Sequence, residues 1–119
     1  MRRSLLALLI FPLAFGACAS EPGERSANTH DVEAKDHFFE PKEIRAQPGS
    51  MTFRVRNTGT EIHEFEIFEG PKLVDEVEDI TPGLERTLTV TLKAGTYEYA
   101  CKFDDHYERG MKGTLKVEG

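Results

Sequence analysis

The chain has 119 residues and a formal net charge of −6. Its 21 acidic side chains outnumber the 15 basic ones, so no basic stripe is available to neutralise phosphates, and nucleic acid is excluded as an expected partner. The length allows one domain with one core, near the size at which a bound metal or a disulfide adds needed stability.

The first eighteen residues have the layout of a secretory signal. Arg2 and Arg3 precede the apolar run LLALLIFPLAF, and small residues follow at GACAS; the apolar run is shorter than a transmembrane helix. We therefore predict a signal peptide over residues 1–18 and an exported mature protein. Cys18 lies in a lipoprotein-type box that overlaps an ordinary signal-peptidase site. We favour lipidation of Cys18, which would anchor the protein without spanning the membrane.

A polar stretch follows this signal. Residues 19–31 are rich in polar and small residues and include Pro and Gly, and they are predicted to form a tether. One domain is expected over residues 32–119. Removal of the leader with its two arginines leaves 13 basic and 21 acidic side chains, a net charge of −8. This charge favours solubility and attracts cationic proteins or metal ions.

Short alternating runs occupy the rest of the chain. The runs MTFRVRN, HEFEIF, RTLTVTL and GTYEYAC alternate between apolar and polar residues, the pattern of half-buried strands. Turn signals separate the runs: Pro48-Gly49, Thr58-Gly59, Gly70-Pro71, Pro82-Gly83 and Ala94-Gly95. No segment longer than a turn or two has a helical period. Seven or eight strands at this spacing predict an all-β fold, either a sandwich or a closed barrel.

Alternation also predicts which side chains face the core. In HEFEIF, His63 shares its face with two apolar residues that must point inward if the strand is to bury anything. The opposite face, expected to point outward, carries Glu64, Glu66 and Phe68. In GTYEYAC, Cys101 shares its face with two tyrosines and is expected to point inward as well.

Four residues of metal-ligand type converge on this core. His63 and Cys101 point inward from strands, and His106 and Met111 follow Cys101 at five-residue intervals. A thiolate, two imidazoles and a weak axial thioether form a trigonal copper site, whereas zinc rarely recruits methionine. We therefore predict one copper ion, cycling between Cu(I) and Cu(II), bound by these four residues. The alternatives are an inert buried thiol, a core histidine and a space-filling methionine.

These residues resemble the cupredoxins, the small blue copper proteins. The likeness rests on GTYEYAC with His106 and Met111 after it, on Asn57 through His63, and on FFEPKEIRAQPGS near the start of the domain. Within the family, EFEIFEG, DITPG and GTYEYAC are similar to the cupredoxin-like domain of the periplasmic component of the Efe iron-uptake system. The resemblance implies a Greek-key β-sandwich with copper at one end, held by His63, Cys101, His106 and Met111.

Two positions depart from these relatives. Phe39 stands near a cysteine of the iron-uptake domain, whose final loop is also shorter. Glu64 replaces an asparagine that ties two ligand loops together in many electron-transfer cupredoxins, so that link is not expected here.

His106, like loop histidines in such sites, is expected to face solvent. His30 and His37 are interpreted as surface histidines, and Tyr97 as a tyrosine corner. Asp104, Asp105 and Glu108 are interpreted as a solvated loop, and the alternative is a binding role for iron, a second copper ion or a basic redox partner.

No catalytic motif accompanies the predicted ligands. The sequence has no serine elbow, phosphate loop or His-Glu-x-x-His helix, and four protein ligands leave no vacant metal position. The predicted function is non-enzymatic single-electron transfer by an extracytoplasmic monomer, in the periplasm or at the cell surface, with a redox protein as partner. Two alternatives remain, a copper- or iron-handling protein that passes metal to a receiving protein, and a metal-free adhesive or structural sandwich.

Overall fold

The computed structural model describes residues 16 and 28–119, which contain nine strands and no helix. In chain order the strands are β1 (Thr29–Lys35), β2 (Phe38–Glu40), β3 (Glu43–Ala46), β4 (Gly49–Asn57), β5 (His63–Glu69), β6 (Lys72–Ile80), β7 (Glu85–Leu92), β8 (Gly95–Ala100) and β9 (Lys112–Val117). Within this described part, no helix is long and apolar enough to cross a membrane. The predicted signal peptide over residues 1–18, including Cys18, lies outside the described residues apart from Gly16.

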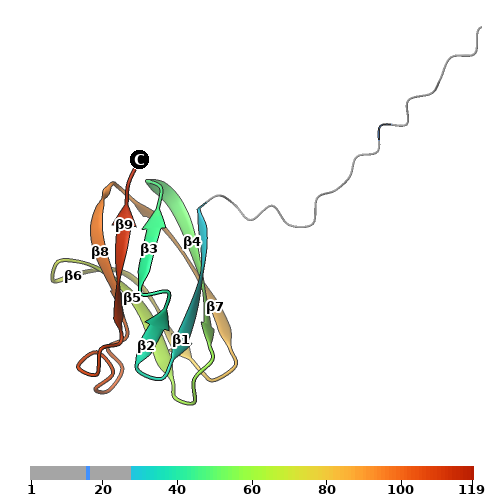
Figure 1. Cartoon of the computed structure of the whole chain (residues 1–119), viewed down its shortest axis with the longest axis vertical. Coiled ribbons are helices and arrows are strands. Elements are labelled where there is room, and N and C mark those ends of the chain that lie inside the picture. The colour runs from blue at the N-terminus through green and yellow to red at the C-terminus, as the bar shows by residue number, and fades with distance from the viewer. Residues whose placement is uncertain (1–15, 17–27) are drawn as a thin grey trace, which may run out of the picture.

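Two sheets pack face to face (Figure 1). One sheet has the order β2-β1-β4-β7 and the other the order β3-β9-β8-β5-β6. Neighbouring strands are antiparallel except for two parallel pairs, β1 with β4 and β3 with β9. The chain crosses between the sheets five times, from β2 to β3, β3 to β4, β4 to β5, β6 to β7 and β7 to β8, as in Greek-key sandwiches. The predicted all-β sandwich is confirmed.

The strand boundaries near the start of the domain differ from the prediction. β2 and β3 flank Pro41 and join different sheets, so the described residues form nine strands rather than seven or eight. Proline has no N–H to donate, which favours a break in strand pairing at this point. Thr29 of β1 already pairs with Thr52 of β4. Residues 29–31 therefore belong to the sheet rather than to the tether predicted over 19–31.

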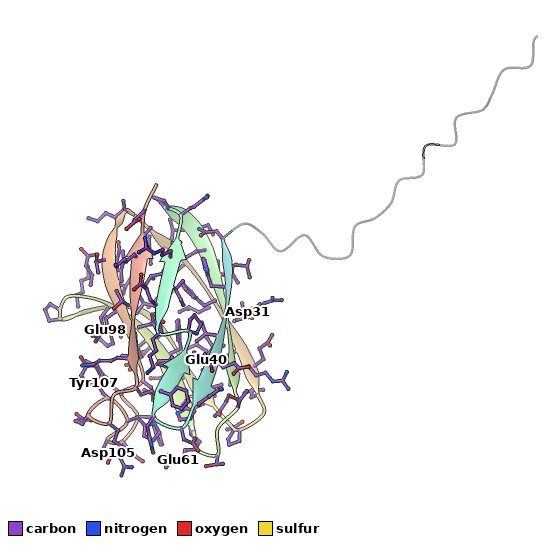
Figure 2. All side chains as sticks on the ribbon, viewed as in Figure 1. Asp31, Glu40, Glu61, Glu98, Asp105 and Tyr107 are labelled. Carbon is purple, nitrogen blue, oxygen red and sulfur yellow. The ribbon has the colours of Figure 1, made fainter. Side chains whose placement is uncertain are left out.

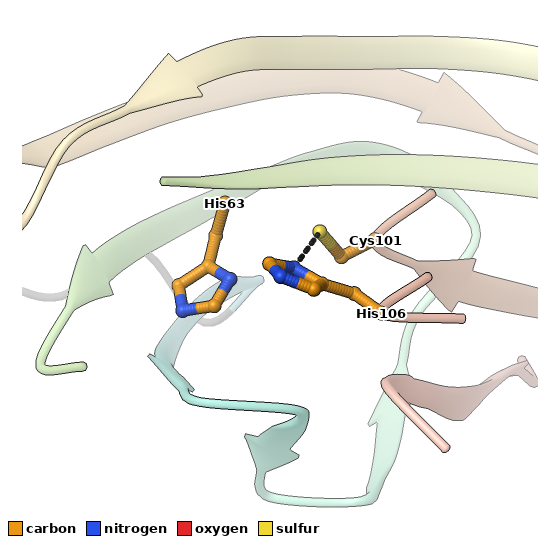
Figure 3. A group of neighbouring side chains, drawn as sticks. All are labelled: His63, Cys101 and His106. Atoms are coloured by element: carbon orange, nitrogen blue, oxygen red, sulfur yellow. Dashed lines mark hydrogen bonds between the residues drawn. The ribbon is translucent and has the colours of Figure 1, made fainter. Parts of the chain in front are cut away.

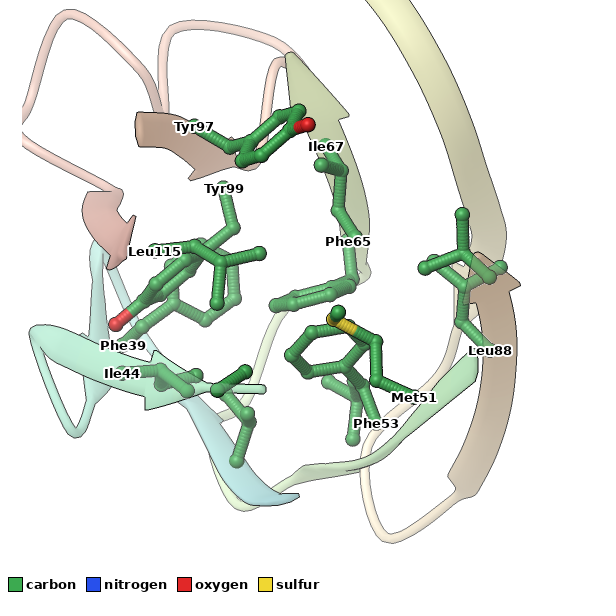
Figure 4. Packing of buried hydrophobic residues seen from close by; sticks show 14 of the residues in the cluster. Phe39, Ile44, Met51, Phe53, Phe65, Ile67, Leu88, Tyr97, Tyr99 and Leu115 are labelled. Atoms are coloured by element: carbon green, nitrogen blue, oxygen red, sulfur yellow. The ribbon is translucent and has the colours of Figure 1, made fainter. Parts of the chain in front are cut away.

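Aromatic side chains fill the core between the sheets (Figure 4). Phe39, Phe53, Phe65 and Tyr99 are fully buried, and their ring centroids lie 5.4 to 5.7 Å apart in successive contacts. Phe39 is therefore a core side chain. The Tyr97 hydroxyl donates a hydrogen bond of 2.9 Å to the carbonyl four residues earlier, which is the bond expected of a tyrosine corner.

The outward face of β5 is more buried than alternation predicts. The inward side chains of β5 and β8 are buried as expected, but Glu66 and Phe68 on the opposite face are each only 7% exposed. Lys102 contributes to this burial. Its ammonium lies 4.1 Å from the Phe68 ring centroid, and its backbone N–H donates to Glu66 Oε2 at 2.9 Å. Alternation assigns a face to a residue but does not predict how far its neighbours cover that face.

The buried carboxyl group of Glu66 makes stability depend on pH. Burial raises the pKa of Glu66, and the charges of Glu76 and Glu78 act in the same direction. The folded state then holds this proton more tightly than the unfolded state, so stability falls as pH rises above the usual carboxyl range. We expect Glu66→Gln to raise the melting temperature near pH 8 and to change it much less near pH 4, in thermal unfolding followed by circular dichroism.

Glu69→Gln is the matched control for this prediction. Glu69 lies on the same strand and is exposed, so its substitution should change the melting temperature little at either pH. An equal effect of Glu66→Gln at both pH values would contradict the assigned role of the Glu66 charge.

Candidate metal centre

The four predicted ligands come from β5 and from the β8–β9 connection. His63 is the first residue of β5, Cys101 directly follows β8, and His106 and Met111 lie in the connection to β9. Figure 1 shows this connection at the same end of the sandwich as the β1–β2 and β4–β5 connections. All four side chains are buried, with exposures of 1% or less. The strands therefore bring the ligand set to one end of the core.

Three donor atoms converge in this region (Figure 3). Cys101 Sγ and one ring nitrogen each of His63 and His106 lie within 4.8 Å of one another. Cys101 Sγ is 3.5 Å from His106 Nδ1, and the centroids of the two imidazole rings are 5.1 Å apart. His63 Nδ1 is buried and has no hydrogen-bond partner among the described residues. A buried ring nitrogen without a partner is unfavourable, so this atom fits a metal ligand.

Asp36 holds the opposite edge of the His63 ring. Asp36 Oδ1 lies 3.2 Å from His63 Nε2, and the carboxylate also accepts hydrogen bonds from the hydroxyl and N–H of Thr60 and from the N–H of Glu61. These bonds, above all that from the Thr60 hydroxyl, lower the pKa of Asp36 to about 2. An ionised Asp36 places the ring proton on His63 Nε2, and the Nδ1 lone pair is then free for a metal.

Asn57 and Gly59 shape the connection that leads to His63. The buried Asn57 amide donates to the carbonyls of Glu61 and of the last residue of β6, both at 2.7 Å, and its oxygen accepts from the Gly59 N–H at 2.9 Å. A Cβ atom at Gly59 would collide with the Asp36 carboxylate. Asp36 and Asn57 therefore fix the β4–β5 connection, and neither residue was predicted from the sequence to do so.

The Cys101 sulfur accepts a hydrogen bond from the backbone of Glu64. The Glu64 N–H lies 3.3 Å from Cys101 Sγ. Burial raises the pKa of the Cys101 thiol, so a nearby cation is needed to favour the thiolate. The Glu64 side chain is half-buried rather than exposed. Burial raises the pKa of Glu64 to about 7, and the charges of Glu66 and Glu78 add to the shift.

Backbone hydrogen bonds close the ligand loop on itself. The Cys101 N–H donates to the Met111 carbonyl, and the Met111 N–H donates to the His106 carbonyl, both at 3.0 Å. Gly110 just before Met111 has φ +101°, a conformation that favours glycine. Met111 belongs to the same buried cluster as Cys101. The loop therefore holds a thioether inside the core beside the thiol-bearing residue.

His106 is buried, although it was expected to face solvent. It is 1% exposed, and the rings of His37, His63 and Phe103 lie 5.1, 5.1 and 5.6 Å from its own ring, centroid to centroid. The Glu61 carboxylate lies 3.5 Å from His106 Nε2. His37 is half-exposed and covers His106, so its interpretation as a plain surface histidine is wrong. No periodic pattern indicates this contact, because His37 lies in the turn after β1.

The cupredoxin-like domain family matches residues 5–117 of the chain. This chain belongs to the cupredoxin-like domain family.

Named relatives agree with this assignment. The cupredoxin-like chain is 30% identical over 121 residues to the iron uptake system component EfeO of Escherichia coli K12, a match that covers 99% of this chain and 30% of EfeO. The expected likeness to the Efe system is therefore confirmed, although the chain spans less than a third of that relative.

Two solved structures share the fold. Auracyanin from Roseiflexus castenholzii superposes with a TM-score of 0.70 at 20% identity, over 79% of this chain and 99% of its own. Auracyanin A, a "blue" copper protein from Chloroflexus aurantiacus, has a TM-score of 0.67 at 19% identity, over 76% of this chain and 98% of its own. At these identities the likeness establishes the cupredoxin-like fold alone.

Proposed function

We propose that the chain binds one copper ion through His63, Cys101, His106 and Met111 and carries single electrons outside the cytoplasm. The observation that carries this proposal is His63 Nδ1, a buried nitrogen without a partner among the described residues that lies in one donor group with a thiol and a second imidazole. Copper would supply a one-electron couple between Cu(I) and Cu(II), for which this mixture of nitrogen and soft sulfur donors is suited.

In electron transfer, the protein would fix the positions of the donor atoms and keep water away from them. Asp36 orients His63, backbone bonds close the loop from Cys101 to Met111, and the rings around His106 exclude water. Donors that are held in place before the ion arrives rearrange little when its charge changes. This arrangement favours electron transfer over catalysis as the function of the site.

Metal handling is the second candidate function. It is favoured by the similarity to EfeO, which is described as an iron uptake system component, and it would use the same four residues. The two candidates differ in what happens on reduction. An electron carrier keeps its ion through both oxidation states, whereas a metal carrier must release the ion in one state or to a receiving protein.

We expect the copper-loaded protein to keep its metal through repeated reduction and oxidation near neutral pH in the presence of a Cu(I) chelator. The measurement is the Cu(I)–chelator absorbance after each cycle, compared with the same chelator and copper without protein. Stoichiometric transfer of copper to the chelator on the first reduction would favour metal handling over electron transfer.

We also propose that the protein is a monomer anchored to a membrane by a lipid on Cys18. At the membrane its acidic surface would bind a cationic redox partner. We expect the wild type to fractionate with membranes, and Cys18→Ala to release the protein or to block its maturation. Immunoblots of membrane and soluble fractions test this. A wild-type protein that is entirely soluble, with Ser20 at its N-terminus, would show that ordinary signal peptidase acts instead.

A further inference from the structure

A second group of donor atoms lies directly outside the first. His37, Glu61 and His106 each offer one donor atom, and these atoms lie within 4.8 Å of one another. His37 Nε2 is 2.8 Å from Glu61 Oε2, and His106 Nε2 is 3.5 Å from the same oxygen. Two imidazole nitrogens and one carboxylate oxygen suit borderline divalent cations such as Zn²⁺, Cu²⁺ or Fe²⁺.

This outer group is open to solvent, unlike the inner one. The side chains of Glu61 and His37 are 49% and 30% exposed, whereas that of His106 is 2% exposed. Figure 2 shows Glu61 at the same end of the sandwich as Asp105 of the ligand loop. A cation that approaches this end from solvent therefore meets His37 and Glu61 before it reaches the inner donors.

The backbone around the outer group is arranged to aim its side chains. His37 has φ +69°, a left-handed conformation that is uncommon outside glycine and that clusters at functional sites. Its ring meets the His106 ring edge to face, at an interplanar angle of 68°. The Glu61 N–H donates to Asp36 Oδ1 at 3.2 Å. The same carboxylate that orients His63 therefore also fixes the backbone of Glu61.

His106 belongs to both groups through its two different nitrogens. Nδ1 lies 3.5 Å from Cys101 Sγ, and Nε2 faces Glu61. A neutral imidazole offers one lone pair at a time, because its other nitrogen carries the proton. When the inner donors are free, the proton can lie on Nδ1 and leave Nε2 available to an outer ion. When Nδ1 ligates an inner ion, a neutral imidazole keeps its proton on Nε2, so an outer ion must displace that proton before it can use this nitrogen.

We propose that His37, Glu61 and Nε2 of His106 form an outer site that captures a borderline divalent cation while the inner site is empty, and that filling the inner site weakens it. The outer site lies on the solvent side of the inner donors, so an ion that enters from solvent reaches the outer site first. His37 and Glu61 are not inner ligands, so the outer site can be tested whether or not the inner site binds copper.

Zinc titration in a Cys101→Ala background tests the outer site, because this substitution removes the inner thiolate. By isothermal calorimetry we expect one Zn²⁺ per chain, with an affinity that falls at least tenfold when His37→Asn is added. Asparagine tolerates a positive φ, so the turn should keep its shape, and circular dichroism verifies the fold. The matched control is His30→Asn, since His30 packs on Phe53 and belongs to neither donor group, and it should change the affinity less than twofold.

Equal affinities in the His37→Asn and His30→Asn proteins would overturn the proposal. So would a shift of the His63 ring resonances without a shift of the His37 ring resonances when Zn²⁺ is added to the Cys101→Ala protein, because the ion would then occupy the inner donors.

The sharing of His106 is tested separately in the wild type. With Cu(I) bound at the inner site, Zn²⁺ should bind at least tenfold more weakly than it does to the Cys101→Ala protein. Undiminished Zn²⁺ binding by the copper-loaded protein would overturn the sharing. Failure of the wild type to bind copper would contradict the proposed function and would leave the zinc result with Cys101→Ala as an independent test of the outer site.

Discussion

Cys101→Ser is expected to abolish the visible colour of the copper-loaded protein. Thiolate sulfur donates charge to Cu(II) and gives an intense visible absorption, whereas a serine oxygen is a much poorer donor. The substitution is small, and the serine oxygen can still accept the hydrogen bond that the Glu64 N–H gives to Cys101 Sγ. We therefore expect the fold to persist while the absorption band disappears completely in a Cu(II) titration followed by visible spectroscopy.

Met51→Leu is the matched control for this experiment. Met51 is another buried residue with a sulfur atom, it lies on β4, and it is not among the proposed ligands. The coloured species should form in this variant with unchanged stoichiometry. An unchanged spectrum in Cys101→Ser would overturn the copper proposal as a whole.

Asp36→Ala is expected to lower copper affinity by roughly ten- to a hundred-fold, the usual effect of losing a group that orients a metal-binding histidine. The variant removes the acceptor beside His63 Nε2. It also removes the acceptor of the hydrogen bonds from the Thr60 hydroxyl, the Thr60 N–H and the Glu61 N–H. The histidine can then rotate or place its proton on Nδ1. Competition with chelators of known affinity measures the loss.

Two further variants separate orientation from charge. Asp36→Asn keeps an oxygen that can accept these hydrogen bonds and should lose less affinity than Asp36→Ala. Asp31→Ala removes a carboxylate of β1 that pairs with Arg54 at 2.7 Å and is in neither donor group, and it should leave copper affinity unchanged. Equal affinities in wild type and Asp36→Ala would show that Asp36 does not position His63.

Strand alternation was sufficient to predict the directions of His63 and Cys101. His63 begins β5 and Cys101 directly follows β8. Side chains take opposite faces in turn along a strand, and both residues are fully buried. The same rule failed for the burial of Glu66, because the cover from Lys102 comes from a residue 36 positions away. A local pattern carries no information about such a distant neighbour.

The groups that surround the ligands could not be predicted in this way. Asp36 and His37 lie between β1 and β2, Glu61 lies between β4 and β5, and such connections have no hydrophobic period. Their meeting depends on how the two connections pack at one end of the sandwich. The available signals were the turn pair Thr58-Gly59 and the Asp-His pair before FFEP, and neither indicates a partner. The burial of His106 was missed for the same reason, since His37 and Phe103 cover it.

The hydrogen bond from the Cys101 N–H to the Met111 carbonyl marks the boundary between the ligand loop and the paired strands β8 and β9. It lies next to the last β8–β9 pair, Ala100 with Lys112, so both ends of residues 102–110 are fixed by the strands. An insertion, deletion or change of donor within that segment need not alter the register of β8 and β9. The length and the donor residues of the loop can therefore change while the pairing of β8 and β9 beneath it stays the same.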